Sequence, residues 1–490
     1  MNLKKILSGI DGIKARGNVD IEVSSIENDS RKVKEGSMFF AIKGFTTDGT
    51  DYIESAIGNG AKVILTDDSF DERTVNIPSN VTLIKVPDSR YAMAICSCNY
   101  YDNPSKKLKL VGITGTKGKT TTTYMIKEML QKQGHKAGLI GTIAVYSGDR
   151  KIKDSDRTTP ESIELQALLA EMVEDGCDVA IMEVSSQSLK LNRVAGCEFY
   201  IGLFTNFSED HISPKEHPDM QDYFESKLKL MRMCKFGFIN ADDLQVAKVP
   251  KMLKDCDIKT YGIDNTANLI AKDITITNSY VDFKVKIYDK NERIKVGIPG
   301  RFSVYNSLAA ISIAKQLGCD AEKIKESLLD VRVPGRSELV NNPKGLTIMI
   351  DYAHSPESLE NILNAVKSYT RGKVISVFGC GGDRDSGKRP KMGEISGRIA
   401  DFTIITSDNP RTENPDAIVK EIEEGIKKTK GKYVCIVDRV EAIKYAIDMA
   451  NKRDLILLAG KGHEPYQEIN NVKYDFDERV IVNQIIKGEI

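Results

Sequence analysis

A glycine-rich turn between a short apolar strand and a helical pattern constrains this chain more than any other feature. The segment LKLVGITGTKGKTTTTYMIKEML runs from Leu108 to Leu130. Its later apolar residues, Met125, Ile126 and Met129, recur on one face of a predicted helix. A strand that meets glycines and then opens a helix is the context of a phosphate-binding loop. The turn therefore predicts an α/β domain that binds a nucleotide.

The residue types in GTKGKTT suit contact with the phosphates of ATP. Glycines let backbone N–H groups approach phosphate oxygens, and the helix N-terminus adds partial positive charge. We expect Lys119 to reach the β- and γ-phosphates and the Thr120 hydroxyl to bind Mg²⁺. The spacing departs from GxxxxGK[ST], because Ile113 occupies the first glycine position, and an ordinary glycine-rich turn is the alternative. The residues assigned to ATP are Gly115, Thr116, Lys117, Gly118, Lys119, Thr120 and Thr121.

Apolar runs alternate with helical patterns along most of the chain, which predicts three α/β domains. Residues 1–105 mix short strands and helices. Residues 106–332 hold the glycine-rich turn and a mostly parallel sheet, with an antiparallel excursion expected over residues 255–300. Residues 333–490 read as a second open, mostly parallel sheet of the Rossmann-like kind, in which ligands bind beyond the carboxyl ends of the strands.

The composition excludes several classes of protein. Lys+Arg and Asp+Glu are 70 each, so the basic excess of a nucleic-acid binder is missing. Nine scattered cysteines without a CxxC pair favour a reduced, cytoplasmic protein. The N-terminus lacks the apolar core of a signal peptide, and no run approaches the roughly 20 apolar residues of a membrane span. We expect a monomer that neither inserts into membranes nor binds nucleic acid.

A nucleotide switch or motor is the rival class for a phosphate-binding loop. NKRD, at Asn451 to Asp454, even matches the NKxD pattern that reads guanine. It precedes the apolar strand DLILLAG, whereas a guanine-reading loop follows its strand. We interpret this match as chance.

One further motif suggests a metal site beside the loop, and two other polar motifs follow it along the chain. Glu183 ends an apolar strand in EVSSQSL, and His211 closes TNFSEDH after another strand. A carboxylate at such a strand end can bind Mg²⁺ through oxygen. Lys227 lies sixteen residues beyond His211 in YFESKLKLM. A structural histidine and an unmodified surface lysine are the alternatives.

With GTKGKTTT, these motifs make the chain resemble the Mur ligase family of bacterial cell-wall (peptidoglycan) synthesis over nearly its whole length. It is most similar to the members that add the third stem-peptide residue to UDP-N-acetylmuramoyl-L-Ala-D-Glu. The resemblance implies that Glu183 and His211 bind Mg²⁺. It also implies that Lys227 is carbamylated, which turns a cation into a carboxylate-like metal ligand.

The resemblance also assigns residues to the nucleotide. It places Asn306 of GRFSVYNSLAA on the adenine side and Arg336 of VPGRSE on the γ-phosphate as a charge clamp. In DYAHSPESL it gives Asp351 to the ribose or a nearby contact and sets His354 near the phosphate. Ser303 stands where the family commonly has asparagine, and a plain amphipathic helix would also explain this segment.

The contacts with the nucleotide-linked peptide are implied in the same way. Uridine binding falls to Ser30 in DSRKVKEGSMFFAIKG, where a polar turn before a strand is the alternative. The muramoyl peptide is expected to meet Thr158, Thr159, Ser185 and Arg193. A threonine pair before proline is also ordinary turn chemistry. Three residues depart from the family pattern and put the finer contacts in doubt: Arg157, Gln187 and Leu191.

Three loops after strands of the last block are expected to converge at one sheet edge as the acceptor site. They are GCGGDRDSGKRP, SDNPRTENP and GKGHE. Two guanidiniums, Arg384 and Arg411, suit carboxylates, and Glu464 suits an ammonium group. This set matches an amino acid with an extra distal carboxylate, and in the family DNPR marks meso-diaminopimelate enzymes. Surface salt bridges are the alternative. The acceptor residues are Arg384, Asp408, Asn409, Pro410, Arg411, Gly460 and Glu464.

The implied reaction is ATP-dependent amide formation through an acyl phosphate. The catalytic groups are Lys119, Arg336, His354 and Lys227, and the metal ligands are Thr120, Glu183, His211 and Lys227. The partners are UDP-N-acetylmuramoyl-L-Ala-D-Glu and a diamino acid, with L-lysine as the alternative to diaminopimelate. A folylpolyglutamate-synthetase-like ligase is a more distant alternative. Three domains that bring three substrates together predict hinge closure.

Overall fold

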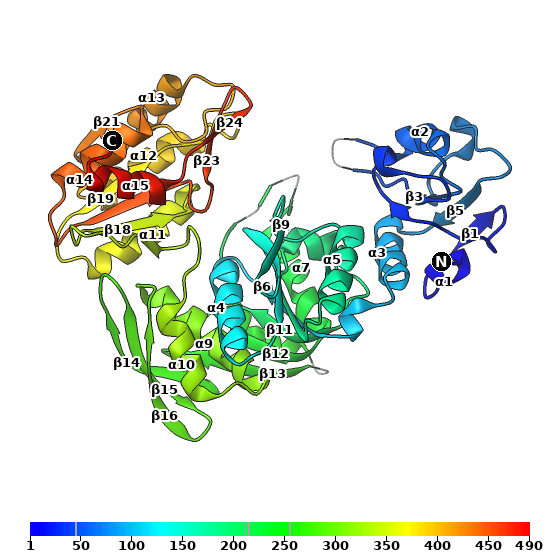
Figure 1. Ribbon diagram of the computed structural model, residues 1–490, viewed down its shortest axis with the longest axis horizontal. Helices are drawn as coiled ribbons and strands as arrows, with labels where there is room; N and C mark the ends of the chain where they lie inside the picture. The colour runs from blue at the N-terminus through cyan, green and yellow to red at the C-terminus, as the bar shows by residue number, and fades with distance from the viewer. Residues whose placement is uncertain (45–46, 211, 214–215, 254–255) are drawn as a thin grey trace. The chain divides into compact units, whose positions relative to one another are not determined.

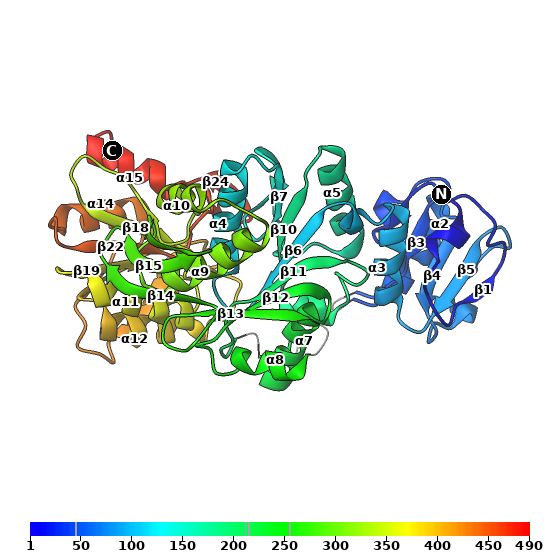
Figure 2. The same ribbon diagram turned by 90° about the horizontal axis from the view of Figure 1, so that it is seen from below.

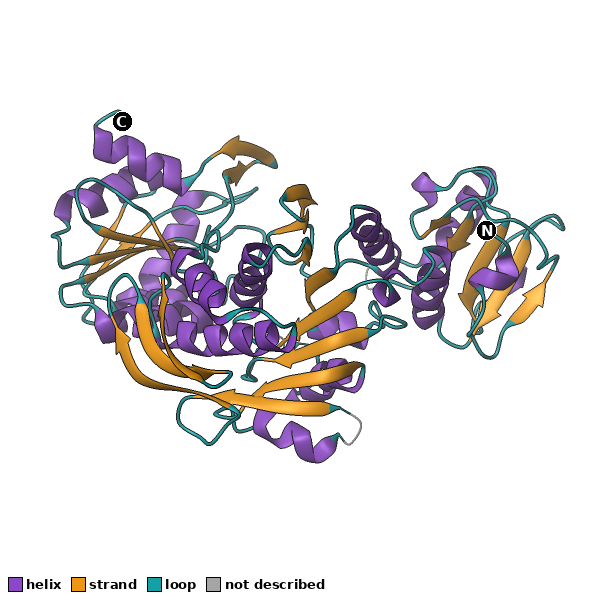
Figure 3. Cartoon of the chain, turned by 60° about the horizontal axis from the view of Figure 1, so that its bottom comes forward, coloured by secondary structure: helices purple, strands orange, loops and turns teal. Residues whose placement is uncertain are grey.

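Sheets flanked by helices make up most of the described chain (Figures 1 and 3). The computed structural model describes residues 1–44, 47–210, 212–213, 216–253 and 256–490. Two compact units divide it: Met1–Leu269 with Ala309–Cys319, and Ile270–Leu308 with Asp320–Ile490. The predicted α/β class is confirmed, whereas the boundaries after residues 105 and 332 stay a prediction. Within the described ranges, no helix is long and apolar enough to span a membrane.

The N-terminal part of the first unit is a five-stranded sheet in the order β1-β5-β4-β3-β2. Only β1 is antiparallel to its neighbour. Strands and helices here are β1 (Lys14–Arg16), β2 (Ile26–Glu27), β3 (Met38–Phe40), β4 (Val63–Asp67), β5 (Thr82–Val86), α1 (Leu3–Ile6), α2 (Ile53–Gly58) and α3 (Ser89–Tyr100). Two apolar clusters pack on the sheet, one with α1 and α3 and one with α2.

The central sheet of the first unit carries the glycine-rich turn. Its parallel strands lie in the order β13-β12-β11-β6-β10-β7, and β8 and β9 extend it antiparallel. The strands are β6 (Lys109–Thr114), β7 (Ala137–Ile140), β8 (Ala144–Ser147), β9 (Arg150–Asp154), β10 (Val179–Glu183), β11 (Phe199–Phe204), β12 (Cys234–Asn240) and β13 (Asp257–Gly262). Because β6 lies between β10 and β11, the loops after all three strands meet at one edge.

Helices cover both faces of this sheet (Figure 2). They are α4 (Lys119–Lys132), α5 (Ser162–Glu174), α6 (Ser186–Lys190), α7 (Met220–Arg232) and α8 (Val249–Met252). Apolar residues of α5 and α7 share one buried cluster with Leu110, Ala180 and Phe204 of the sheet. The helix α4 contacts β6, β7 and β10, and its buried residues lie outside that cluster. The phosphate loop is thus held between a buried strand and a buried helix.

The second unit begins with an antiparallel meander, β14 (Leu269–Ile276), β15 (Val281–Ile287) and β16 (Lys290–Val296). Its burial alternates along β15, as expected for strands with one covered face. Two helices follow, α9 (Arg301–Gln316) and α10 (Ala321–Asp330). The predicted antiparallel excursion is therefore correct for these strands. It is wrong for IKTYGID, because β13 pairs parallel with β12.

The rest of the second unit is a doubly wound sheet in the order β17-β18-β22-β19-β20-β21. Its pairs are parallel except β17 with β18. A separate hairpin, β23–β24, follows β22. Strands and helices are β17 (Glu338–Leu339), β18 (Thr347–Asp351), β19 (Val374–Phe378), β20 (Phe402–Ile405), β21 (Tyr433–Cys435), β22 (Leu455–Ala459), β23 (Tyr466–Ile469), β24 (Val472–Asp475), α11 (Pro356–Tyr369), α12 (Lys388–Ile399), α13 (Pro415–Ile426), α14 (Arg439–Met449) and α15 (Glu478–Lys487).

Alternate residues of these strands pack into two separate apolar clusters. Leu455 and Leu457 pack with α11, α12 and α13, whereas Ile456 and Leu458 pack with α14 and α15. Side chains that point alternately to two buried faces explain why the strand reads as one continuous apolar run. The predicted Rossmann-like arrangement is confirmed, and the loops after β19, β20 and β22 reach the same edge.

Candidate functional site

The glycine-rich loop connects β6 directly to α4. Gly115 and Gly118 have φ of +141° and +86°, which favours glycine at both positions. A Cβ at Gly115 would lie 1.9 Å from Thr205 Oγ1. The Lys119 amine donates back to the carbonyls of Gly115 and Thr116, at 2.9 and 3.1 Å. The conformation of the loop backbone is therefore set by contacts within the protein itself.

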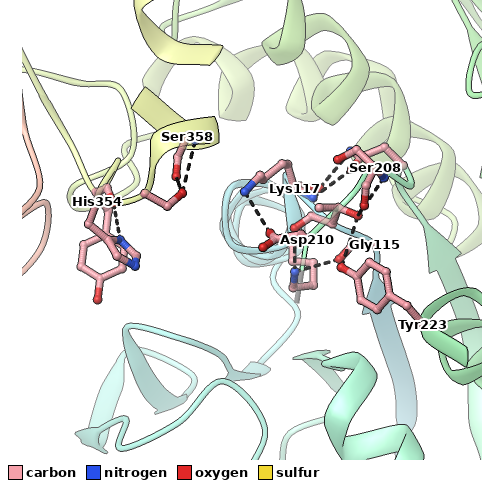
Figure 4. A network of polar contacts seen from close by, with 12 residues as sticks. Gly115, Lys117, Ser208, Asp210, Tyr223, His354 and Ser358 are labelled. Carbon is pink, nitrogen blue, oxygen red and sulfur yellow. Dashed lines mark hydrogen bonds and ion pairs between the residues drawn. The ribbon is translucent and has the colours of Figure 1, made fainter. Parts of the chain in front are cut away.

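Thr205 and Asn206, which follow β11, hold the glycine-rich loop in place through hydrogen bonds. Thr205 Oγ1 and Asn206 Nδ2 both donate to the Lys117 carbonyl, at 2.8 and 3.0 Å. The Lys117 N–H donates to Asn206 Oδ1 at 2.8 Å. The Lys117 amine pairs with Asp210 at 3.1 Å (Figure 4). Asn206 and Asp210 belong to the TNFSEDH motif, whose His211 lies outside the described residues.

Two predicted metal ligands meet at the start of α4. Thr120 Oγ1 donates to Glu183 Oε2 at 3.0 Å. Glu183 is buried and also accepts from the N–H and hydroxyl of Thr142, at 2.8 and 3.0 Å. A Cβ at Gly141 would lie 2.5 Å from Glu183 Oε1, so the glycine leaves room for the carboxylate. Hard oxygens from a hydroxyl and one carboxylate fit Mg²⁺ that is shared with substrate phosphates.

The metal would need oxygens beyond these two. Among the described residues, no group of three His, Cys, Asp or Glu side chains could hold an ion. Mg²⁺ usually takes one or two carboxylates and completes its shell with phosphate oxygens and water. The donor set therefore fits a nucleotide-bound ion rather than a resident one.

Lys227 reaches the same loop from α7. Its side chain is 2% exposed, and its amine donates to the Gly115 carbonyl at 2.9 Å. The amine lies 4.4 Å from the ring centroid of Tyr223, whose hydroxyl is 3.3 Å from Thr116 Oγ1 (Figure 4). Burial, and then the nearby Lys119 charge, hold the pKa of Lys227 well below its usual range. Two amines at one carbonyl favour an uncharged Lys227.

A buried histidine, which sequence reasoning missed, fixes the start of α7. His217 Nδ1 lies 2.5 Å from Asp222 Oδ2, and Nε2 lies 2.9 Å from Ser186 Oγ. The His217 ring also packs on Tyr223 with centroids 5.0 Å apart. These contacts tie α7 to α6, which begins three residues after Glu183. No sequence motif marked His217, because its partners come from two other elements.

The four residues predicted to meet the muramoyl peptide come together beside Glu183. Thr159 Oγ1 donates to the Glu183 carbonyl at 2.9 Å and accepts from the Ser185 N–H at 3.0 Å. Arg193 Nη1 donates to the Thr159 carbonyl at 3.3 Å. Thr158 Oγ1 lies 3.1 Å from Thr142 Oγ1. Their clustering agrees with the prediction, while their role in binding stays a prediction.

Glu161 forms ion pairs with two arginines of this region. One of them, Arg157, departs from the family pattern. Glu161 pairs with Arg193 Nη2 at 2.9 Å and with Arg157 Nη1 at 2.6 Å. Burial lowers the pKa of Arg193, and the charge of Glu161 opposes that effect. Arg157 therefore has a structural partner in place of the amide contact that the family pattern suggests.

Ser30, the predicted uridine contact, lies in a short 3-10 turn, Ser30–Lys32, of the N-terminal part. Asp29 caps this turn by accepting from the Arg31 N–H at 3.1 Å, and Arg31 Nε and Nη2 donate to the same carboxylate. These bonds from Arg31 lower the pKa of Asp29 to about 2. The turn depends on an ionised Asp29.

Asp29→Ala is expected to lower the free energy of unfolding by about 1 kcal/mol at neutral pH, mainly through the lost cap. Solvent keeps the exposed ion pair itself weak. The native pKa lies below the unfolded value of 3.8, so the stabilisation is complete above about pH 4 and fades as pH falls toward about 2. Urea unfolding of both proteins at several pH values measures this. A difference that stayed constant below pH 4 would contradict it.

The second unit holds the remaining nucleotide-side residues. Arg336 lies over the Tyr352 ring at 4.8 Å, and no hydrogen-bond partner for its buried Nε occurs in the described structure. Asp351 accepts from the Ser337 N–H at 2.8 Å. The carbonyl of Tyr352 lies 2.8 Å from His354 Nδ1, which must donate to it (Figure 4). Asn306 is buried on α9. The buried guanidinium edge of Arg336 fits an anionic ligand.

The three predicted acceptor loops do converge at the carboxyl edge of β19, β20 and β22. Asn409 Nδ2 donates to Glu464 Oε2 at 2.8 Å, and Arg411 Nη1 donates to the Gly382 carbonyl at 2.8 Å. A Cβ at Gly381 would lie 3.0 Å from Arg411 Nη1 and 3.9 Å from Arg384 Cγ. Both predicted arginines therefore border one glycine turn. Asp408 and Pro410 are buried in the same loop, and Gly460 approaches Asp408.

Lys461 lies buried among the acceptor loops and was not among the residues predicted from the sequence. Its amine is fully buried, 3.1 Å from Asn409 Oδ1, 3.5 Å from Asp408 and 3.8 Å from Glu464. Burial lowers the pKa of Lys461, while burial and the nearby Asp408 raise that of Glu464. A ligand ammonium would favour the ionised form of Glu464.

A buried ion pair holds the starts of two acceptor loops. Arg439 pairs with Glu478 at 2.8 Å, with both side chains at most 1% exposed. Its guanidinium also donates to the carbonyls of Ser407 and Ala459, at 3.1 and 2.9 Å. Those carbonyls directly precede Asp408 and Gly460. Since Arg439 and Glu478 lie 39 residues apart, no local pattern could have revealed the pair.

Glu478→Ala is expected to destabilise the second unit by about 3–5 kcal/mol, because it leaves the buried Arg439 charge without its partner. Guanidinium unfolding with a probe in this unit measures the loss. The exposed Glu441→Ala on α14 is the control, expected to change stability by less than about 0.5 kcal/mol. Equal midpoints for Glu478→Ala and the parent would contradict the assignment.

The NKRD match has a structural explanation. Asp454 Oδ1 accepts from the Lys373 N–H at 2.7 Å, and its Oδ2 accepts from the Asn451 N–H at 2.9 Å. The segment fixes the turn before β22, at the edge opposite the acceptor loops.

Comparisons with known proteins match all three parts of the chain. The model "Mur ligase family, catalytic domain" matches residues 22–101, "Mur ligase middle domain" matches 113–314, and "Mur ligase, glutamate ligase domain" matches 335–462. A UDP-N-acetylmuramoyl-L-alanyl-D-glutamate--2,6-diaminopimelate ligase of Caldanaerobacter subterraneus subsp. tengcongensis is 48% identical over 487 residues, 99% of either chain. One from Clostridium acetobutylicum is 46% identical over 493 residues, again 99% of each.

Solved structures give the same pattern. A structure of a UDP-N-acetylmuramoyl-L-alanyl-D-glutamate--2,6-diaminopimelate ligase superimposes with a TM-score of 0.72 at 29% identity, covering 100% of this chain and 99% of that one. The MurF ligase of Thermotoga maritima in complex with ADP has a TM-score of 0.62 at 19% identity, covering 95% and 98%. The second likeness concerns the fold alone.

Proposed function

The chain belongs to the Mur ligase family, and from this premise we propose that it joins meso-diaminopimelate to the D-glutamate of UDP-N-acetylmuramoyl-L-Ala-D-Glu at the expense of ATP. Curated relatives of 43–48% identity carry the name of that ligase. We place this step of peptidoglycan synthesis in the cytoplasm.

The arrangement of charges at the acceptor edge is the observation that carries the proposal. Two arginines border the Gly381 turn, and the carboxylate of Glu464 accepts a hydrogen bond from Asn409 in the neighbouring loop. A diamino dicarboxylic acid offers a distal carboxylate for a guanidinium and a distal ammonium for Glu464. L-lysine offers only the ammonium. Diaminopimelate can therefore contact both a guanidinium and Glu464 through its distal groups, whereas lysine can contact only Glu464.

For the nucleotide, we assign the phosphates of ATP to the backbone of Gly115 to Thr121 and to Lys119. The N–H groups at the start of α4 point toward such a ligand, and the helix dipole favours its negative charge. Arg336 is assigned to the γ-phosphate as a second cation, with Asn306, Asp351 and His354 on the nucleotide as the resemblance implies. Bound Mg²⁺ would neutralise phosphate oxygens as a Lewis acid, with Thr120 and Glu183 as its protein ligands.

Lys227 is proposed to act as its carbamate. An uncharged amine can add to CO₂, which forms an N–C bond and releases one proton, and the low pKa of Lys227 favours that uncharged form. The product is a carboxylate next to the Gly115 carbonyl. It would supply an anionic oxygen in addition to the Glu183 carboxylate. His217 and Asp222 hold the helix that carries it.

The reaction then follows from positioning. Thr158, Thr159, Ser185 and Arg193 hold the peptide so that the D-glutamate side-chain carboxylate faces the γ-phosphorus. Its oxygen forms a bond to phosphorus while the bond to the β–γ bridging oxygen breaks, giving an acyl phosphate and ADP. The free amine of the acceptor attacks the acyl carbon, the tetrahedral adduct loses phosphate, and the nitrogen loses a proton. Lys119 and Arg336 stabilise the transferring phosphoryl group.

Phosphate release in the presence of ATP tests this proposal. We expect release only when both UDP-N-acetylmuramoyl-L-Ala-D-Glu and diaminopimelate are present with Mg²⁺. Omission of either substrate should reduce the rate to background. Release that was indifferent to both substrates would instead favour a nucleotide switch or motor.

A further inference from the structure

The β23–β24 hairpin packs along the DNPR loop as if it were an added strand. Gln467 Nε2 donates to the Asp408 carbonyl at 2.7 Å, and the Glu468 N–H donates to Asn409 Oδ1 at 3.0 Å. The Arg411 N–H donates to the Glu468 carbonyl at 3.0 Å, and the Asn470 N–H to the Arg411 carbonyl at 2.7 Å. Figure 1 shows this hairpin apart from β18 and β19 of the second unit's six-stranded sheet.

The backbone of Arg411 needs such support. Its φ is +50°, in the left-handed region that residues with a Cβ rarely adopt. Hydrogen bonds to both its N–H and its carbonyl hold this conformation from the hairpin side. The direction in which the arginine side chain leaves the loop is therefore set by the β23–β24 hairpin.

The side chain of Arg411 is held from the hairpin as well. Arg411 Nε donates to Glu468 Oε2 at 3.1 Å, and both side chains are 21% exposed. Nη1 donates to the Gly382 carbonyl at 2.8 Å. These two bonds use one N–H of Nε and one of Nη1. Three N–H groups of the guanidinium, one on Nη1 and two on Nη2, take no part in these two bonds, enough for a two-pronged contact with a carboxylate.

We propose that Glu468 is a positioning residue for acceptor specificity, which aims the Arg411 guanidinium at the distal carboxylate of the incoming amino acid. This inference rests on the proposed function. Glu468 touches Arg411 and not the expected reacting atoms, so it acts through Arg411. Because lysine lacks the distal carboxylate, the role of Glu468 concerns diaminopimelate alone.

Steady-state kinetics on matched variants test the proposal. For Glu468→Ala we expect KM for diaminopimelate to rise about 10-fold, as if a loosened Arg411 kept only one of its two charge-assisted hydrogen bonds to the substrate carboxylate, with kcat within about 2-fold. Glu468→Gln keeps an acceptor oxygen for Nε and should raise KM only about 3-fold. KM for ATP, KM for the nucleotide peptide and any turnover of lysine should not change. Asp475→Ala, an exposed carboxylate on β24 of the same hairpin, is the control and should match the parent.

Opposite results would overturn the idea. A lower KM in Glu468→Ala would mean that Glu468 competes with the substrate carboxylate for Arg411. An unchanged KM, or a loss confined to kcat, would remove Glu468 from acceptor positioning.

A spectroscopic readout separates this inference from the proposed function. In protein labelled with ¹⁵N-arginine, the Nε–H signal of Arg411, assigned through Arg411→Lys, should exchange slowly with water in the parent and in Asp475→Ala. It should lose that protection in Glu468→Ala. If the parent protein ignored diaminopimelate, the proposed function would fail, and this signal would still decide whether Glu468 holds Arg411. Unchanged protection in Glu468→Ala would refute the inference.

Discussion

Lys227→Ala should lower kcat for ATP-dependent amide formation by about 100- to 1,000-fold. The lysine is buried at the phosphate loop, with its amine 2.9 Å from the Gly115 carbonyl. As a carbamate it would supply a ligand oxygen, and alanine supplies none. Initial-rate phosphate release at saturating substrates measures the loss. Lys229→Ala is the matched control, because this lysine lies on the same helix but donates to the Leu189 carbonyl away from the loop.

The nature of the Lys227 contribution can be separated from simple packing. A small carboxylate such as formate or acetate should restore part of the activity of Lys227→Ala, because it can occupy the place of the lost carbamate. It should not restore Lys119→Ala, in which a phosphate-binding cation is missing. Full activity of Lys227→Ala without any additive would contradict the proposed role of the carbamate.

Arg411→Ala should raise KM for diaminopimelate about 100-fold. Two charge-assisted hydrogen bonds to a carboxylate contribute about 3 kcal/mol together, which corresponds to that factor. The effect should be roughly ten times that of Glu468→Ala, since the latter keeps the guanidinium and only loosens it. Turnover of lysine, where it can be detected, should not change. Kinetics with diaminopimelate as the varied substrate measure the effect.

A surface arginine of the same unit provides the control for Arg411. Arg398 pairs with Glu360 on the outer side of α12, and Arg398→Ala should leave KM for diaminopimelate at the parent value. Should Arg411→Ala behave like Arg398→Ala, the assignment of the distal carboxylate to Arg411 would be wrong.

Local sequence patterns predicted most of the fold. Strands such as β22 are buried on both faces, so five apolar residues in a row identify them without any knowledge of their neighbours. The phosphate loop was equally visible, because glycine, lysine and threonine lie within one turn. The strand β13 was assigned the wrong direction, since its direction depends on pairing with β12 and not on its own residues.

The candidate site was predicted only in part, for the same reason. Motif residues such as Thr120, Glu183 and Arg411 come from loops whose residue types suit a ligand directly. The residues that hold these motif residues in place cannot be recognised from their own residue type. Arg439 with Glu478, His217 with Ser186, and Glu468 with Arg411 are partners brought together by the tertiary fold, and each supporting residue alone reads as an ordinary polar residue. Lys461 is intermediate, because it lies inside the GKGHE motif but reads as a surface lysine until its burial is known.

Competition between the two candidate acceptors tests the central claim most directly. The protein would be incubated with ATP, Mg²⁺, UDP-N-acetylmuramoyl-L-Ala-D-Glu and equal concentrations of meso-diaminopimelate and L-lysine, and the product mass would be read. The two tripeptide products differ by the mass of one CO₂. We predict that nearly all product carries diaminopimelate. Product carrying mainly lysine, or no tripeptide product at all, would contradict the account.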